Sequence, residues 1–431
     1  MYELKDILTP EIDRVCGILD RNGEHKLSVL FRNCYPNTFE TTTKRMEDGT
    51  TYIFTGDIPA MWLRDSTAQV HQILPLTADS NDAADVIEGL IRRQFQYVLY
   101  DPYANAFNET ENGNGHVKDL PKQKPMIWER KYEVDSLCFV LWLCAEFHQY
   151  SGRTDYLTDG VYRRVLRTIL DLWKTEQHHG EQSPYTFIRL NCRQSDTLSH
   201  EGKGTPVAYT GMTWSGFRPS DDACVYGYLI PSNLFAITVL RSSAKIAQDV
   251  LRDAELADEM SLLADEIENG VRQYGVVDHP KYGKMYVYET DGLGNYVLMD
   301  DSNVPSLISL PYFGYCDASD PVYQNTRRFI LSEDNPYFYT GKVISGTGSP
   351  HTPQGYVWHI GLSLQGLTSI DPQERMQVLR MLEASDADTG YMHEGVCADD
   401  PSQYTRPWFA WSNSIFSEFV LQYAQQLEDR S

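Results

Sequence analysis

Apolar residues recur at helical spacing along most of the chain. Between positions 162 and 173 they repeat every three or four residues and so mark one face of a helix: Tyr162, Val165, Leu166, Ile169, Leu170 and Trp173. Ser80 and Asp82 can cap another such stretch, which carries Val86, Ile87, Leu90, Ile91 and Phe95. The same pattern predicts helices at 10–21, 25–34, 60–76, 131–151, 229–250, 254–274, 303–314, 321–332, 356–368, 372–385 and 408–427. The chain is therefore predicted to be all-α.

Long polar loops separate these predicted helices. They are rich in Gly, Asn, Asp and Pro and cover 105–124, 191–222, 336–355 and 386–407. Long ordered loops are usually functional. The strand-like pieces 51–54 and 285–288 can form hairpins at the mouth of a barrel. Many helices joined by large loops suggest a toroid of paired helices in an inner and an outer ring, although periodicity alone does not establish it.

No linker or low-complexity tract divides the chain, so residues 1–431 are predicted to form one domain. The longest apolar run, 137–145, is too short to span a membrane and is predicted to be a buried helix. The first residues lack the pattern of a secretory signal.

Composition narrows the range of partners. The chain has 60 acidic and 37 basic residues, a formal net charge of −23, so most of its surface would repel a nucleic acid. It also has 28 Tyr, 16 Phe and 8 Trp; most are expected in the core, although such rings also stack on sugars.

The cysteines indicate a reducing compartment. There are eight, none in a C-x-x-C pair, and they are expected to be buried free thiols: Cys16, Cys34, Cys138, Cys144, Cys192, Cys224, Cys316 and Cys397. With no membrane span and no signal, a cytoplasmic location is predicted.

Motifs for metals, phosphates and nucleophiles are missing from the sequence. The eleven histidines form no H-E-x-x-H and no zinc spacing with cysteine. The Gly-rich stretch 345–351 lacks the lysine of a phosphate loop, and is a turn or a source of backbone donors for a neutral ligand. There is no G-x-S-x-G elbow. Neither a metal site nor a cofactor is expected.

Carboxylates remain as candidates for catalysis. Four clusters, at 56–66, 128–136, 218–222 and 391–395, combine acids with aromatic or basic residues. Cleavage of a glycosidic bond needs a carboxylic acid to protonate the leaving oxygen and a carboxylate to activate water or attack the sugar. The structural alternative is that Asp57 and Asp221 are caps or turn residues, and that Arg64 with Asp65 and Glu129 with Arg130 are ion pairs.

In this order, the clusters resemble glycoside hydrolase family 125, the exo-α-1,6-mannosidases. The matching stretches span nearly the whole chain: GDIPAMWLRDS (56–66), WERKYEVDSL (128–137), TWSGFRPSDDAC (213–224), SGTGSPHTPQGYVWHIGL (345–362), YMHEGV (391–396) and FAWSNSIFSEFV (409–420). The resemblance implies an (α/α)6 barrel whose long loops form a pocket. It also implies metal-independent, inverting hydrolysis of terminal α-1,6-linked mannose, with Asp221 as general acid and Glu394 as general base.

That chemistry sets further expectations. Asp221 must be protonated at working pH, so its pKa is expected to be raised, while Glu394 stays ionised and holds a water. Inversion needs roughly 6.5–9.5 Å between the two carboxyls, whereas roughly 5–5.5 Å would indicate a retaining route. The predicted pocket walls are Asp57, Trp62, Arg64, Asp65, Glu129, Glu133, Asp135 and His351. His393 can either tune the base or be a bystander.

Two other classes stay open at this point. A sugar epimerase or isomerase on the same barrel would use histidines, for which His351, His359 and His393 are available. A non-catalytic glycan-binding protein would not need both Asp221 and Glu394. A phosphorylase would lack the base, so Glu394 argues against it. The expected partners are mannose-containing oligosaccharides, such as N-glycan-type fragments, which would first be imported into the cell.

Overall fold

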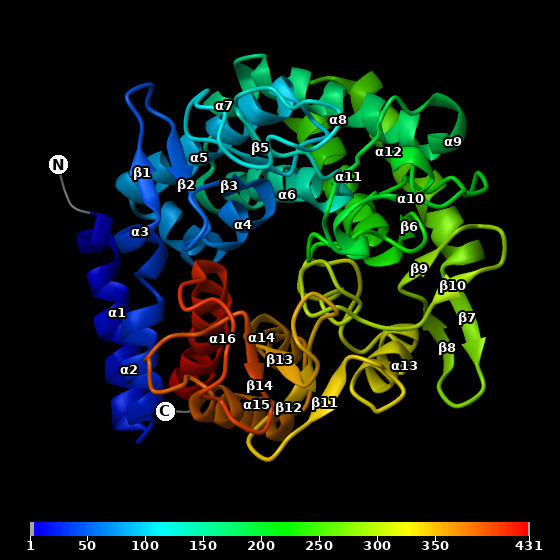
Figure 1. Ribbon diagram of the computed structural model, residues 1–431. Coiled ribbons are helices and arrows are strands. Elements are labelled where there is room, and N and C mark those ends of the chain that lie inside the picture. The colour runs from blue at the N-terminus through cyan, green and yellow to red at the C-terminus, as the bar shows by residue number, and fades with distance from the viewer. Residues whose placement is uncertain (1–3, 430–431) are drawn as a thin grey trace.

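The computed structural model describes residues 4–429, and within them the helices form a ring of two layers. In Figure 1 the chain passes once around the ring, from the blue helices α1 (Leu4–Arg21) and α2 (His25–Cys34) to the red helix α16 (Ala410–Glu428). Helix α16 packs against α1 and α2, which closes the circle. The fold is an (α/α)6 barrel, as predicted.

Outer and inner elements alternate along the chain. Besides α1 and α2, the outer helices are α5 (Asn81–Tyr100), α8 (Val161–Gln177), α12 (Ala254–Tyr274), α13 (Pro321–Ile330) and α15 (Pro372–Ala384). Besides α16, the inner helices are α4 (Leu63–Ala68) with the 3-10 helix η1 (His71–Ala78), α6 (Val134–Ser151), α11 (Ile230–Asp249) and α14 (His359–Leu367). Short helices in the connections are α3 (Asn37–Thr41), α7 (Asp155–Thr158), α9 (His179–Gln182), η2 (Gln194–Asp196) and α10 (Ser199–Gly202).

Sequence pattern explains which layer each helix joins. Outer helix α8 buries one apolar stripe, whereas the run from Leu137 to Cys144 in inner helix α6 is buried on every side. Ser80 accepts a hydrogen bond from the backbone N–H of Ala83 at 3.2 Å, which confirms the predicted cap of α5. Most of the predicted helices are confirmed within a few residues.

One predicted helix is wrong. The segment 303–314 occupies the fourth inner position but consists of turns. Pro311 lacks the N–H that a helix needs in its interior. The buried carboxylate of Asp300 instead accepts hydrogen bonds from the backbone N–H groups of Leu307 (2.8 Å) and Ile308 (3.1 Å). Side-chain acceptors thus replace helical carbonyls and hold the buried segment in a non-helical shape.

The predicted helix 60–76 is also only partly helical, because it begins as strand β3 (Met61–Trp62) and breaks between α4 and η1.

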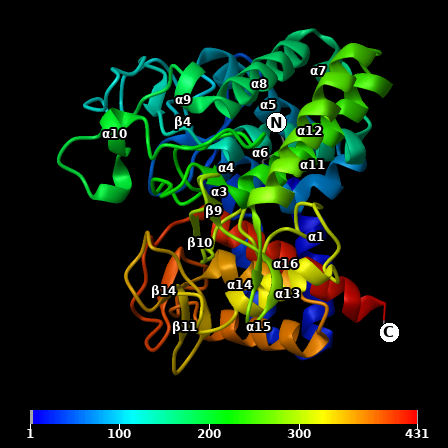
Figure 2. The same ribbon diagram turned by 90° about the vertical axis from the view of Figure 1, so that its right-hand side faces the viewer.

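Small antiparallel sheets of two or three strands gather at one end of the ring. They comprise β1 (Thr43–Arg45) with β2 (Thr51–Ile53); β3 with β4 (Ala106–Phe107) and β5 (Ile127–Glu129); β6 (Tyr228–Leu229), β9 (Glu289–Thr290) and β10 (Tyr296–Val297); β7 (Val276–His279) with β8 (Gly283–Tyr286); β11 (Phe338–Thr340) with β12 (Ser345–Thr347); and β13 (Tyr356–Trp358) with β14 (Gly395–Cys397). Figure 2 shows β4, β11 and β14 on the left with the long loops, away from the C-terminal end of α16. The strand predicted at 51–54 is confirmed as β2, whereas the one predicted at 285–288 is confirmed only in part, because β8 ends at Tyr286.

Aromatic rings fill the inside of the ring. Phe139 of α6 packs edge-on against Phe235 of α11 at 5.2 Å between centroids, and against Trp411 of α16 at 6.3 Å. Phe235 in turn contacts Phe313 at 4.6 Å. These rings form a floor beneath the loop end of the barrel, and we call this set of four the aromatic floor.

All eight cysteines are free, but the prediction that they are buried holds for only half of them. Cys16, Cys34, Cys138 and Cys144 are buried in helices, whereas Cys192 is exposed and Cys224, Cys316 and Cys397 are half-buried, because these four lie in loops or at a strand end. No helix between residues 4 and 429 is long and apolar enough to cross a membrane.

Candidate active site

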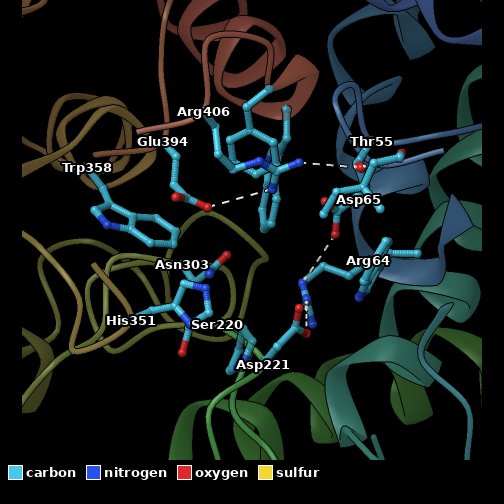
Figure 3. A pocket seen from close by; sticks show the side chains of 15 residues that line it. Thr55, Arg64, Asp65, Ser220, Asp221, Asn303, His351, Trp358, Glu394 and Arg406 are labelled. Atoms are coloured by element: carbon cyan, nitrogen blue, oxygen red, sulfur yellow. Dashed lines mark hydrogen bonds and ion pairs between the residues drawn. The ribbon is translucent and has the colours of Figure 1, made fainter. Parts of the chain in front are cut away.

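A pocket of about 270 Å³ opens among the loops above the aromatic floor. Six of the predicted site residues line it: Trp62, Arg64, Asp65, Asp221, His351 and Glu394. Figure 3 shows Asp221 and Glu394 on opposite sides of the pocket, Asp221 beside Arg64 and Glu394 beside Arg406 and Trp358. Two carboxyls far apart in the sequence therefore face one cavity.

Four predicted wall residues lie elsewhere. Asp57 sits at the rim, where it pairs with Arg406. Glu129, Glu133 and Asp135 are buried behind the wall, because cationic side chains draw their carboxyls inward. The prediction that these three line the pocket is wrong for this structure; they form a supporting layer instead.

That layer is built around the buried guanidinium of Arg64. Its nitrogens lie 2.6 Å from Glu133, 3.1 Å from Asp135, 3.0 Å from Asp221 and 3.5 Å from Asp65. One guanidinium cannot balance four carboxylates, of which Asp65, Glu133 and Asp135 are buried and Asp221 is partly exposed, so the cluster retains protons. Burial raises the pKa values of Asp65 and Asp135 to about 6, although Arg64 opposes the shift.

Asp221 and Glu133 share a hydrogen bond within this cluster. The side-chain amide of Asn105 lies 3.3 Å from an oxygen of each. Burial, helped by the charges of Asp221 and Asp135 and opposed by Arg64, raises the pKa of Glu133 well above its usual range. Burial also acts to raise the pKa of Asp221, but Arg64, the hydrogen bond from Glu133, and Lys131 together lower it.

The shared proton therefore resides on Glu133. This differs from the expectation that the pKa of Asp221 itself is raised. The reason is that Arg64 and Lys131 stabilise the ionised form of Asp221, while Glu133 is more deeply enclosed.

The backbone at Asp221 is unusual. Its φ of 65° lies in the left-handed region, which is uncommon for a residue other than glycine. A tight turn holds it, with hydrogen bonds from Asp221 N to Arg218 O (2.9 Å) and from Arg218 N to Asp222 O (2.8 Å). The buried ammonium of Lys131 donates to the carbonyl of Asp221 at 2.7 Å. Because its carboxylate bonds to the side chains of Arg64 and Asn105, Asp221 does more than shape a turn.

Glu394 stands just before strand β14. Pairing of Trp358 with Gly395 fixes this strand against β13. The hydroxyl of Thr405 donates to the carboxylate of Glu394 at 3.0 Å, and a guanidinium nitrogen of Arg406 lies 3.7 Å from its other oxygen. These contacts leave the carboxylate directed at the pocket, as Figure 3 shows.

Arg406 is a site residue that was not predicted. Its guanidinium lies 4.2 Å from the ring centroid of Phe409 and donates to Asp57 at 3.0 Å, which links the rim to Glu394. Asp57 and Arg406 are 349 residues apart, so no local pattern could pair them. The only signal was the aromatic stretch 408–411 that follows Arg406.

Other pocket residues were also missed. Asn303 lines the cavity, but it was assigned to the first position of a predicted helix, 303–314, that does not form. Trp358, Phe409 and Trp411 belong to stretches that resemble the family, yet residue type alone gave them no role. The remaining lining residues are Thr55, Ile58, Pro219 and Ser220.

Of the histidines in residues 4–429, only His351 lines the pocket. Its ring lies 3.2 Å from Asp222; burial acts to lower its pKa, but Asp222 and the nearby Glu394 raise it to about 9. His359 and His393 are buried behind the wall, where His393 hydrogen-bonds the carbonyl of Arg406. His393 thus supports the loop that carries Arg406. An isomerase mechanism that uses two histidines as acid and base would have one of them, His351, in the pocket.

No group of three or more His, Cys, Asp or Glu side chains that could hold a metal ion occurs in the part of the chain that the structure describes.

Comparisons with known proteins agree with this geometry. A sequence profile described as metal-independent alpha-mannosidase (GH125) matches residues 24–421. The meiotically up-regulated gene 157 protein of Schizosaccharomyces pombe (strain 972) is 40% identical over 419 residues, which cover 92% of this chain and 82% of that protein.

Solved structures extend the comparison. A metal-independent α-mannosidase from Streptococcus pneumoniae, solved in a non-productive complex with α-1,6-mannobiose, is 45% identical, with a TM-score of 0.95 over 99% of this chain and 100% of that one. A bacterial glucoamylase, 13% identical with a TM-score of 0.53 over 96% of this chain and 57% of that one, shares the fold alone. The chain belongs to glycoside hydrolase family 125, the metal-independent α-mannosidases.

Proposed function

We propose that this protein removes terminal α-1,6-linked mannose from the non-reducing end of oligosaccharides with inversion at the anomeric carbon. Asp221 is the general acid and Glu394 the general base. The observation that carries the proposal is the placement of these two carboxyls on opposite sides of one enclosed pocket. The α-1,6 linkage is supported by the disaccharide bound to the Streptococcus pneumoniae relative.

The acid step uses the proton held by the Asp221–Glu133 pair. Glu133 passes the shared proton across their hydrogen bond to Asp221, and Asp221 gives it to the glycosidic oxygen as the bond to the anomeric carbon breaks. Both carboxyls are then ionised beside Arg64, which pairs with each of them. Lys131 and the turn at Asp221 keep the acid pointed at the pocket.

The base step takes place on the opposite wall. Glu394 accepts a proton from a water that attacks the anomeric carbon from the face opposite the leaving group. Thr405 and Arg406 hold the carboxylate in place for that water. Inversion requires roughly 6.5–9.5 Å between the two carboxyls, and this separation stays a prediction.

The shape of the pocket fits removal of a terminal sugar. A pocket that ends at Trp411 and the aromatic floor admits the end of a chain rather than its middle. Arg64, Asp65 and Asn303 offer donors and acceptors for sugar hydroxyls, and Trp62 and Trp358 offer ring faces. Mannose-containing oligosaccharides, including N-glycan-type fragments, are the proposed substrates.

Proton NMR of the protein with α-1,6-mannobiose and EDTA tests the proposal. We expect mannose to be released and to appear first as the β-anomer. Appearance of the α-anomer first would refute inversion. Folded protein that releases no mannose would refute hydrolysis of this linkage.

A further inference from the structure

A second cavity, of about 580 Å³, lies beside the active-site pocket. It is enclosed by the loop 194–205, the segment 218–225 and Pro350. Its size is within the range of ligand sites, roughly 300–1,000 Å³. These segments belong to the loops that also carry Asp221 and His351.

The two cavities share a wall. Asp221 lines the active-site pocket, whereas its neighbour Asp222 lines the second cavity. The backbone is left-handed at Asp221, where the two neighbouring side chains turn toward different cavities. In the same way, Pro350 lines the second cavity and its neighbour His351 lines the active-site pocket. The ring of His351 lies 3.2 Å from Asp222, so these two side chains form the shared wall.

The lining of the second cavity suits a neutral ligand rich in hydroxyl groups. Within residues 4–429, the half-buried side-chain hydroxyls of Ser195 and Thr205 form no hydrogen bond. The charged lining residues are already neutralised, Arg218 by Glu289 at 2.5 Å and Asp222 by His351. An anionic or cationic ligand would find no free counter-charge there, whereas a sugar would find unused donors and acceptors.

The proposed reaction in the active-site pocket indicates on which side of that pocket the rest of the substrate lies. The acid must touch the oxygen of the bond that breaks, so the leaving saccharide starts at Asp221. The second cavity lies on the Asp221 side of the active-site pocket, behind the wall formed by Asp222 and His351, and therefore on the side where the leaving saccharide begins.

We propose that the second cavity is a subsite for the reducing-side part of the substrate, which binds the sugars beyond the first leaving unit. The inference rests on the proposed function. It makes the enzyme selective for length: α-1,6-mannotriose reaches the second cavity, α-1,6-mannobiose does not, and α-mannosyl fluoride has no leaving sugar at all.

The test measures kcat/KM of the wild-type protein and of Ser195→Trp on these three substrates. We expect wild type to prefer mannotriose over mannobiose by about tenfold, the effect of a few hydrogen bonds. Ser195→Trp fills the cavity and should abolish that preference. Thr205→Trp also fills the cavity and should act in the same way. Ser195→Ala, which fills nothing but removes one of the two free hydroxyls, should lose only part of the preference.

Other results overturn the inference. Equal kcat/KM for mannotriose and mannobiose in wild type, or a preference that survives both tryptophan variants, would show that the second cavity binds no part of the substrate. An equal loss on all three substrates would show that the variants disturb the catalytic site rather than a subsite. If wild type does not cleave mannobiose, the proposed function fails and this inference with it; if mannobiose is cleaved without a length preference, only this inference fails.

Discussion

In the proposed mechanism the two walls of the active-site pocket, the acid wall at Asp221 and the base wall at Glu394, use the same functional group for opposite roles. On the acid wall, four carboxyls surround the buried guanidinium of Arg64, so protons stay in the cluster. On the base wall, the single carboxylate of Glu394 faces a hydroxyl and the guanidinium of Arg406. The comparison teaches that the surroundings of a carboxyl, more than the carboxyl itself, decide whether it donates or accepts a proton.

The largest effects should come from the two carboxyls themselves. Asp221→Ala and Glu394→Ala should each lower kcat/KM for mannobiose by about 100- to 10,000-fold, the usual range for general acid–base groups. On α-mannosyl fluoride the two should differ, because fluoride leaves without a proton: Asp221→Ala should regain much of its rate and Glu394→Ala should not. Steady-state rates on both substrates measure this. Equal losses on the fluoride would show that the assigned roles are wrong.

The proton on the acid wall can be tested through pH. Glu133→Gln removes the proton that Glu133 holds for Asp221 and leaves Arg64 and Lys131 to keep Asp221 ionised, so the pair can no longer supply the acid proton at neutral pH. Activity that needs protonated Asp221 should then be lost at lower pH, and kcat should fall by about tenfold or more. The pH profile of kcat/KM reports the shift.

A structural role alone for Glu133 would lower the rate but leave the alkaline limb of that profile in place. Glu133→Asp serves as the control, because it keeps a carboxyl in the cluster and should restore part of the wild-type profile.

On the base wall, Arg406→Ala should lower kcat/KM by about tenfold to 100-fold, since it removes a charged partner of Glu394 and the link to the rim. Asp57→Ala should cost less, because Asp57 touches Arg406 and not the base. The kcat/KM values of both variants on mannobiose show which of the two loses more activity. A larger loss in Asp57→Ala would indicate that the rim, rather than the base, depends on this pair.

The smallest effect concerns the wall between the two cavities. The pKa of His351 is about 9 in the folded protein against 6.5 for a free histidine. The charged pair of His351 with Asp222 therefore stabilises the fold fully below about pH 6.5, and this stabilisation is lost as the pH rises through about 9. Tm measured from pH 6 to 10 should decline more steeply in wild type than in His351→Gln. Identical slopes would mean that the pair does not titrate in this range.

The sequence was informative where local forces decide the structure. The helix 254–274 was predicted with its observed ends because Asp253 caps it and its apolar stripe is regular. The segment 303–314 was not, because Asp300 and long-range packing override an apolar pattern that looks helical. The spacing of apolar residues along the chain carries no information on such side-chain contacts.

The active site shows the same difference between features that the sequence predicts and features that depend on contacts between distant segments. Asp221 and Glu394 were assigned by resemblance to a family, and the structure brings them to one pocket. Residue type could not tell that Glu133 faces Arg64 from behind, or that Arg406 reaches Asp57, since burial and orientation arise only when distant segments meet.

The aromatic floor makes the pocket a dead end. Phe139, Phe235, Phe313 and Trp411 close the interior of the ring, so a freed mannose has no exit at the bottom. On the proposed function it would leave through the mouth that the shortened oligosaccharide still occupies. Each encounter of enzyme and chain would then yield one sugar, because the chain has to withdraw before the next cut, and degradation would proceed by repeated binding rather than by continuous movement along one glycan.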